Sequence, residues 1–215
     1  MSLRAAFANI GAARRQHGWR AAAILIRSAL RRHSWRHDLF GLTTPRPLPP
    51  SAAEARRHHF RFATPDEIAD GCRAGVWTPR HMEAARQGER CLVQSDGDAL
   101  VGYTWVARSP LVFVMDGVYL SLPDDTAYQY WSYTNPEYRG LGYQAARALE
   151  LHRRLAAEGK RRLFLTVECT NFASLKGVRK SGFEKVGDLH MTRRGGKVRV
   201  SLKITEELWC ELRRP

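Results

Sequence analysis

The stretch that most constrains the fold of this chain is residues 134–144, Thr-Asn-Pro-Glu-Tyr-Arg-Gly-Leu-Gly-Tyr-Gln. An apolar and aromatic run, residues 127–133, leads into it, and a helical pattern, residues 145–157, follows it. Pro136 disfavours helical backbone at Asn135, so the strand should end there. The pattern therefore predicts a strand, a tight loop and the N-terminus of a helix.

The loop carries groups that suit a phosphorylated ligand. The first turn of a helix has unpaired N–H groups and the positive end of the helix dipole. Arg139 adds a positive charge, and Gly140 and Gly142 let the backbone approach a ligand closely. A Gly-x-Gly turn by itself is also a common tight connection, so a second motif is needed to decide.

That second motif follows in the chain. A β-rich run, residues 163–168, precedes Asn171 and Ser174, and then Gly182-Phe183. Together the two blocks resemble the GCN5-related N-acetyltransferase family over about residues 57–205. The first looks like the family's acyl-CoA signature, Arg/Gln-x-x-Gly-x-Gly/Ala, and the second like its following strand and helix. One position departs from the signature, because Gln144 stands where the family prefers Gly or Ala.

The resemblance implies an α/β fold with a mixed, splayed sheet that is flanked by helices and holds the cofactor between its central strands. It implies transfer of an acyl group from acetyl-CoA or another acyl-CoA directly to an amine, with the acyl-CoA as co-substrate and no metal. The acceptor would be a small-molecule or protein amine. By the same resemblance, the cofactor-binding residues are Ser132, Thr134, Arg139, Gly140, Leu141, Gly142, Tyr143, Gln144, Asn171 and Ser174.

The resemblance leaves the proton-transfer residues open. The family often uses a tyrosine four residues before the glycine of Gly-Phe, and Val178 occupies that position here. The candidates for the acid are Tyr133 and Tyr143, and the candidate base is Glu168. Each tyrosine could equally be a core aromatic, and Glu168 could form an ion pair with the Arg161-Arg162 region. Water could also serve as the acid, or the protein could be a non-catalytic acyl-CoA-binding regulatory module.

Side chains alternate along a strand, which places the tyrosines that precede the loop. Tyr128 and Tyr130 should share one face of the strand, and Tyr133 should point to the other.

Length and charge divide the chain into two parts. With 215 residues and 44% hydrophobic content, it fits one domain plus an extension. We expect a basic amphipathic helical extension with a Pro-rich linker at 1–50, and the acyltransferase-like domain at 51–215. The net charge is +14, and twelve arginines with only two acidic residues lie within residues 1–63.

The extension reads as two helices separated near Gly18. Their apolar faces would be formed by Leu3, Phe7 and Ile10, and by Trp19, Ala23, Ile26 and Leu30. A basic amphipathic segment such as residues 1–37 can pack on the chain's own domain, lie on a membrane surface or bind nucleic acid. We do not expect nucleic-acid binding, because the chain lacks the interleaved aromatic and basic residues of single-strand binders.

Other features favour a cytoplasmic protein. The apolar run at 21–26 is too short to span a bilayer. The four cysteines are dispersed without metal-ligand spacing, which argues against a disulfide framework or a metal site. Cys169 lies near the expected cofactor site, but direct acyl transfer needs no thiol nucleophile.

The remaining elements follow from alternation and turn residues. Helices should open at Thr64 and Thr78, each followed by proline, and a last helical turn should lie within 206–212. Further strands are expected at 38–44, 58–63, 90–94, 99–108, 111–120, 126–134, 184–193 and 198–204.

Overall fold

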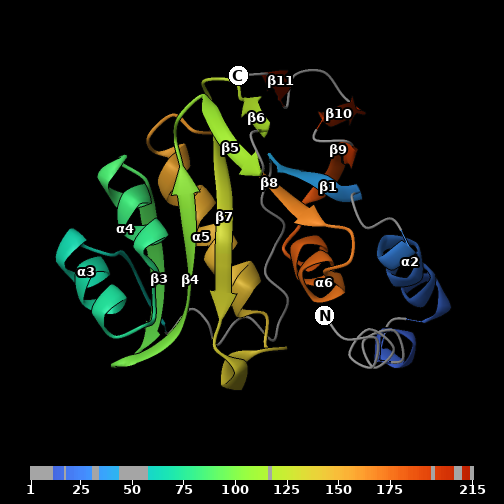
Figure 1. The fold of residues 1–215 in the computed structure, drawn as a ribbon. Coiled ribbons are helices and arrows are strands. Elements are labelled where there is room, and N and C mark those ends of the chain that lie inside the picture. Colours follow the sequence, from blue (N-terminus) through green and yellow to red (C-terminus); the bar gives the residue numbers. More distant parts are fainter. Residues whose placement is uncertain are drawn as a thin grey trace.

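The computed structural model describes residues 12–16, 18–30, 34–43, 58–115, 118–194, 197–205 and 210–213. It contains a large sheet of order β10-β9-β1-β8-β7-β4-β3-β2 and a small sheet of order β11-β6-β5 (Figure 1). The strands are β1 Ser34–Leu42, β2 His59–Phe62, β3 Arg90–Asp96, β4 Ala99–Ala107, β5 Leu111–Met115, β6 Val118–Ser121, β7 Thr126–Thr134, β8 Arg162–Glu168, β9 Glu184–Arg194, β10 Lys197–Ile204 and β11 Glu211–Arg213. The helices are α2 Trp19–Leu30, α3 Pro65–Arg73, α4 Pro79–Arg86, the 3-10 turn η3 Pro136–Tyr138, α5 Tyr143–Ala156 and α6 Phe172–Lys180.

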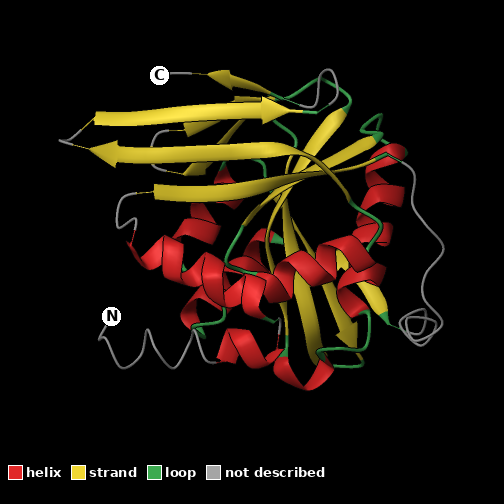
Figure 2. Cartoon of the chain, turned by 90° about the vertical axis from the view of Figure 1, so that its right-hand side faces the viewer, coloured by secondary structure: helices red, strands yellow, loops and turns green. Residues whose placement is uncertain are grey.

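Helices cover both faces of the large sheet, which is the mixed α/β architecture expected from the sequence. In Figure 1, α3 and α4 lie in front of the strands and α5 lies behind them. Figure 2, turned by 90°, shows helices packed below the long antiparallel strands. Every neighbouring pair in the sheets is antiparallel except β7 and β8, which are parallel.

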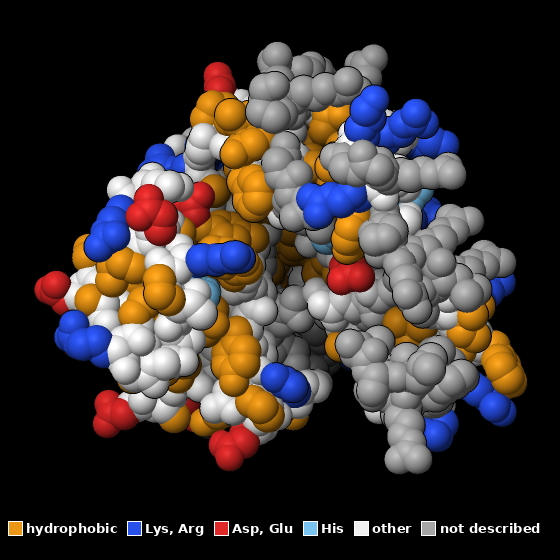
Figure 3. Space-filling model, viewed as in Figure 1, with side chains coloured by type: hydrophobic (Ala, Val, Ile, Leu, Met, Phe, Trp, Pro, Cys, Tyr) orange, Lys and Arg blue, Asp and Glu red, His pale blue; other side chains and the backbone are white. Residues whose placement is uncertain are grey.

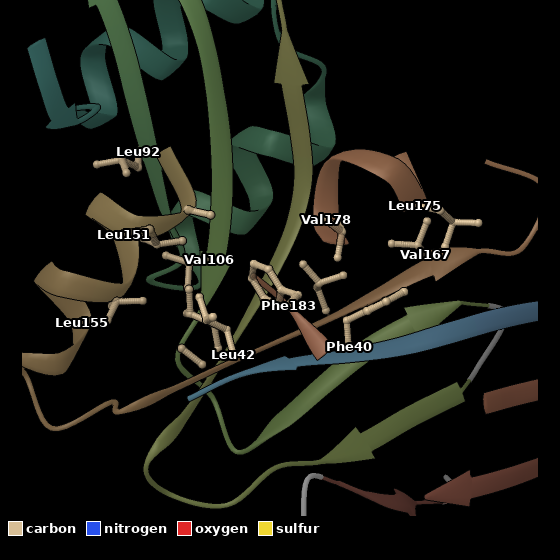
Figure 4. Packing of buried hydrophobic residues seen from close by; sticks show 14 residues of the cluster. Phe40, Leu42, Leu92, Val106, Leu151, Leu155, Val167, Leu175, Val178 and Phe183 are labelled. Atoms are coloured by element: carbon tan, nitrogen blue, oxygen red, sulfur yellow. The ribbon is translucent and has the colours of Figure 1, made fainter. Parts of the chain in front are cut away.

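The core behind the sheet is built by α5 and α6 (Figure 4). Leu151 and Leu155 of α5 and Val178 of α6 pack against Phe40 of β1 and Val106 of β4, and all five are buried. Burying a side chain of this size contributes about 1.5–3 kcal/mol. This core therefore fixes both helices, and with them their N-termini, against the strands.

The strand expected at 38–44 is longer and more central than a short extra strand. It runs from Ser34 to Leu42 as β1 and pairs with β8 on one side and β9 on the other. Its side chains serve both faces, because Phe40 packs in the α5–α6 core and Leu39 packs in the core on the opposite face. A segment of the expected extension thus lies inside the sheet.

Two expectations near the C-terminal half were wrong in detail. The run 111–120 is not one strand but two, β5 and β6, which form the small sheet. Residues 211–213 are not helical, because they pair with β6 as strand β11. Residues 206–209 lie outside the described residues.

The second expected N-terminal helix is present as α2, and the described residues of its expected apolar face are exposed. Trp19, Ala23 and Ile26 are exposed, whereas Ala21 and Ala22 are buried. Small side chains therefore face the protein here. Leu3, Phe7 and Ile10 of the first expected helix lie outside the described residues, as does the side chain of Leu30.

The expected helix openings are confirmed. The Thr64 hydroxyl accepts a hydrogen bond from the N–H of Glu67 (3.2 Å), and the Glu67 carboxylate accepts one from the N–H of Thr64 (2.8 Å). At the second opening, Nδ1 of His81 accepts from the N–H of Thr78 (3.0 Å), so a histidine takes the place of the usual acid.

Candidate active site

The large sheet splits between its two parallel strands. Residues 126–128 of β7 pair with 162–164 of β8, and no further pairs join the two strands as the structure describes them. β7 remains paired with β4, and β8 remains paired with β1 along its length. The two halves of the sheet therefore diverge towards Thr134 and Glu168, and each presents a free strand edge to the gap. In Figure 3 the surface is hollowed between these halves, and hydrophobic side chains lie at the edge of the hollow.

A β-bulge shapes the β7 side of this gap. Tyr130 pairs with Trp105 and Tyr133 with Tyr103, so two residues, Trp131 and Ser132, oppose a single residue of β4. Trp131 has φ 42°, a backbone region that costs a non-glycine residue about 1–3 kcal/mol. Strain of this kind is concentrated at functional sites.

The bulge also corrects the expected side-chain alternation. Tyr128 and Tyr130 do share a face, with ring centroids 5.7 Å apart. Tyr133, however, returns to the face of Tyr130, because the extra residue resets the alternation. Its ring stacks on Tyr103 (5.4 Å), which belongs to the cluster under α3 and α4 together with Tyr130.

The loop after β7 has the expected form. The Asn135 side chain accepts a hydrogen bond from the N–H of Glu137 (3.4 Å), which closes a turn that leads to Arg139. Nε of Arg139 donates to the carbonyl of Thr134 (3.0 Å), so this exposed side chain lies across the end of the strand. Gly140 and Gly142 have φ 84° and 85°, and Gly142 is the N-cap of α5. The unpaired amides of the first helical turn therefore open at this loop.

Gln144, which departs from the family signature, is accommodated by α6. Its side chain lies against Gly177, where a Cβ atom would collide with the amide oxygen of Gln144. The long side chain therefore extends towards α6. Leu141, also in the loop, is exposed.

Arg147 is a site residue that sequence reasoning missed. It follows Tyr143 by one helical turn and is almost completely buried. Its guanidinium donates to the Tyr133 carbonyl (2.8 Å), the Thr134 hydroxyl (2.8 Å) and the Gln94 side-chain oxygen (2.9 Å). Burial lowers the pKa of Arg147 to about 10, which keeps it charged at neutral pH. In the sequence, the one sign of this burial is that Arg147 falls on the apolar side of the helix pattern that became α5.

The expected residues of β8 and α6 occupy the other side of the gap. Asn171 caps α6 by accepting a hydrogen bond from the N–H of Ser174 (3.1 Å), and Ser174 is half-buried. Val178, at the family's usual tyrosine position, is buried in the core. The Ser132 hydroxyl lies 2.6 Å from that of Thr104, on the β4 side of the bulge.

The three expected proton-transfer residues do not gather at one point. Tyr133 is 38% exposed and lies beside the bulge. Tyr143 is buried, and its ring packs against His58 (4.7 Å) and Tyr138 (5.8 Å). Glu168 is exposed, accepts a hydrogen bond from Thr170 (2.7 Å), and lines a cavity beside α6. The alternative partners for Glu168, Arg161 and Arg162, lie at the opposite end of β8, where both pair with Asp125.

A second acidic residue, Glu89, was not apparent from the sequence. It follows α4, and its carboxylate accepts a hydrogen bond from the Tyr130 hydroxyl. Burial raises the pKa of Glu89 to about 7. The Tyr130 ring packs against Trp131 of the bulge, with ring centroids 4.8 Å apart. Trp131 in turn packs against His81 of α4, with ring centroids 4.5 Å apart. A carboxylate that titrates near neutrality thus lies next to the strained strand, and no motif marks it.

Cys169 lacks the character of a nucleophile. Burial is the main reason that its pKa is raised, so the thiol stays protonated at neutral pH.

Comparison with known proteins assigns the family. Residues 55–183 match the model of the acetyltransferase (GNAT) family. The chain therefore belongs to the GNAT acetyltransferase family. This confirms the resemblance seen in the sequence. A search of curated proteins found no match.

Several solved structures are similar to this chain. A GNAT-family acetyltransferase from Colwellia psychrerythraea has 13% identity and a TM-score of 0.49, over 80% of this chain and 56% of that one. The structure of yncA from Salmonella typhimurium, solved with its cofactor acetyl-CoA, has 19% identity and a TM-score of 0.45, over 70% and 95%. A GCN5-related N-acetyltransferase from Sphaerobacter thermophilus has 14% identity and a TM-score of 0.47, over 90% and 57%. The chain spans little more than half the length of the first and third of these proteins.

Proposed function

We propose that the protein transfers an acyl group from acetyl-CoA or another acyl-CoA directly to an amine. The observation that carries this proposal is the divergence of β7 from β8 directly before a glycine loop at the N-terminus of α5. The free edge of β7 offers backbone groups to an extended pantetheine arm, and the loop amides and Arg139 offer donors to the pyrophosphate. Family membership supports the same chemistry.

The amine acceptor would approach from the face that carries α4. There the bulge exposes Trp131 and Tyr133, at 42% and 38% of their surface. An amine must lose a proton to attack the thioester, and Glu89 with its neutral-range pKa of about 7 suits that task, with Tyr130 as its hydrogen-bond partner. Tyr133 is the candidate to return a proton to the departing thiolate.

A matched pair of glycine variants tests the cofactor site. Gly140 and Gly159 have φ 84° and 83°, and in both a Cβ atom would meet open space, so alanine imposes the same backbone strain at either position. Only Gly140 lies in the loop. Gly140→Ala should weaken acetyl-CoA binding by about 1–2 kcal/mol in calorimetry, because the methyl group keeps phosphate off the amides, and Gly159→Ala should not. Equal acetyl-CoA affinities in both variants would show that the cofactor does not bind at this loop.

The alternative is a regulatory module that binds an acyl-CoA without transfer. The observation in its favour is Val178, which has no proton to donate where the family often has a tyrosine. Mass spectrometry of free coenzyme A released across a panel of amines separates the two functions. Release that depends on an amine supports the transferase. Binding that Gly140→Ala weakens, without release for any amine, supports the module.

A further inference from the structure

A cavity of about 840 Å³ lies between the N-terminal helix and α6, and the proposed function does not use it. It is bounded by α2, β1, β9 and the end of β8. Phe172, Lys176 and Arg179 of α6 line it, and at helical spacing these three share one face. Ser174 and Gly177 lie on the opposite side of the same helix, and Gly177 faces α5 there. The cavity is therefore separated from the glycine loop by the thickness of α6.

The wall of this cavity is strongly cationic. Among its charged residues are six cations and two carboxylates: Arg20, Arg36, Lys176, Arg179, Lys180 and Lys185, with Asp38 and Glu168.

Two of the six cations are already neutralised. Nζ of Lys185 bonds to Asp38 (3.0 Å) and Asp188 (2.8 Å), and Arg36 bonds to Asp188 (3.0 Å). This network anchors one wall of the cavity.

The other four cations form no ion pair with any residue that the structure describes. Arg179 and Lys180 stabilise the C-terminus of α6 through the helix dipole, but that does not account for Lys176 or for Arg20 on α2. Like charges that converge from two helices around a concave site raise its potential and attract an anion.

The floor of the cavity is apolar. Ala21 and Leu175 are buried, and Ile24 and Phe172 are partly buried beside them. The Ser34 hydroxyl and Nε2 of His190, 2.7 Å apart, add polar groups at the edge. The volume lies within the range of about 300–1,000 Å³ that is typical of small-molecule sites.

We propose that this cavity binds a phosphorylated small molecule whose apolar part rests on Phe172 and Leu175 and whose phosphate contacts Lys176, Arg179 and Arg20. A concave site of this size, with a floor between two helices, suits an enclosed ligand better than a flat anionic surface. The site is distinct from the glycine loop, so it can be occupied together with an acyl-CoA.

Calorimetric titrations of the full chain with phenyl phosphate and with inorganic phosphate test the proposal. Phenyl phosphate should bind more tightly, because its ring covers the apolar floor. Lys176→Ala/Arg179→Ala should weaken phenyl phosphate binding at least tenfold, and both side chains are exposed, so the fold should persist. The control pair Lys197→Ala/Arg199→Ala on β10, also exposed, should leave the affinity unchanged, and so should Gly140→Ala.

Three results would overturn the proposal. One is the absence of phenyl phosphate binding at physiological ionic strength. Another is equal weakening in the α6 pair and the β10 pair, which would indicate a general charge effect. The third is a membrane result: neither phosphate compound binds, the wild type sediments with phosphatidic acid vesicles, and the α6 double variant does not. This face would then be a membrane surface.

Discussion

The guanidinium of Arg147 on α5 donates a hydrogen bond to the backbone carbonyl of Tyr133 on β7, at 2.8 Å. The helix that opens at the glycine loop is thereby tied to the end of the strand that enters the loop. Because Gly102 of β4 lies against both groups, a side chain there would push them apart. The position of the candidate site therefore depends on one buried cation.

Replacing this cation should lower the stability of the fold. Arg147→Met leaves the Tyr133 carbonyl and the Gln94 side chain without their donor, which should lower the free energy of unfolding by about 2–4 kcal/mol in urea titrations. Arg147→Lys should recover part of this loss. Arg153→Met, on the exposed side of α5, should change little. If both methionine variants unfold alike, Arg147 does not hold the strand.

Gln144 and Gly177 should act as a pair in cofactor binding. Gly177→Ala forces the Gln144 side chain away from α6. Because Gln144 lies in the first turn of α5 beside the glycine loop, we expect acyl-CoA affinity to fall about tenfold. Stability should not fall, because alanine is favoured over glycine within a helix. In the double variant with Gln144→Ala, affinity should return. Calorimetry of the wild type, the two single variants and the double variant gives the coupling free energy between Gln144 and Gly177 in acyl-CoA binding. Additive effects of the two substitutions would contradict the prediction.

Glu89 should make stability depend on pH. Burial raises its pKa from the ordinary value of 4.5 to about 7 in the folded protein. The unfolded chain therefore loses this proton at lower pH than the folded one. The stabilisation that Glu89 provides is fully present below about pH 4.5 and is lost as pH rises through about 7. Glu89→Gln lacks this titration, so the difference between its free energy of unfolding and that of the wild type should increase from about pH 4.5 to about pH 7 and then stay constant.

The same residue should control turnover if it is the base. With a confirmed amine, the wild-type rate should increase as pH rises through about 7, and Glu89→Gln should lower the rate about 10²–10⁴-fold. Glu83→Gln on the exposed side of α4 is the control for stability and rate. An unaltered rate in Glu89→Gln would return the role of base to another group or to water.

Truncation should distinguish the N-terminal helix from the strand that follows it. A chain that begins at Ser34 keeps β1 and should retain cooperative unfolding and acyl-CoA binding. A chain that begins at Ser51 lacks β1, which pairs with both β8 and β9, and should fail to fold. Circular dichroism melts and calorimetry check both. Cooperative unfolding of the shorter chain would show that β1 is dispensable.

The sequence by itself determined the elements whose causes are local. Pro136 ends the strand, Gly140 and Gly142 supply positive φ angles, and Thr64 caps a helix through a residue three positions away. Such contacts join residues a few positions apart, so a short stretch of sequence is enough to predict them. Two local blocks in the right order were enough to indicate the family, which the match over residues 55–183 confirms.

Only the tertiary structure decided which distant residues meet. The strand at 34–42 lies between β8 and β9 because pairing and burial join segments more than a hundred residues apart. A bulge of one residue turns Tyr133 to the face of Tyr130, against simple alternation. Glu89 gains its raised pKa, and Arg147 its partners, from burial against other elements. Burial depends on the whole fold, and no short pattern in the sequence encodes it.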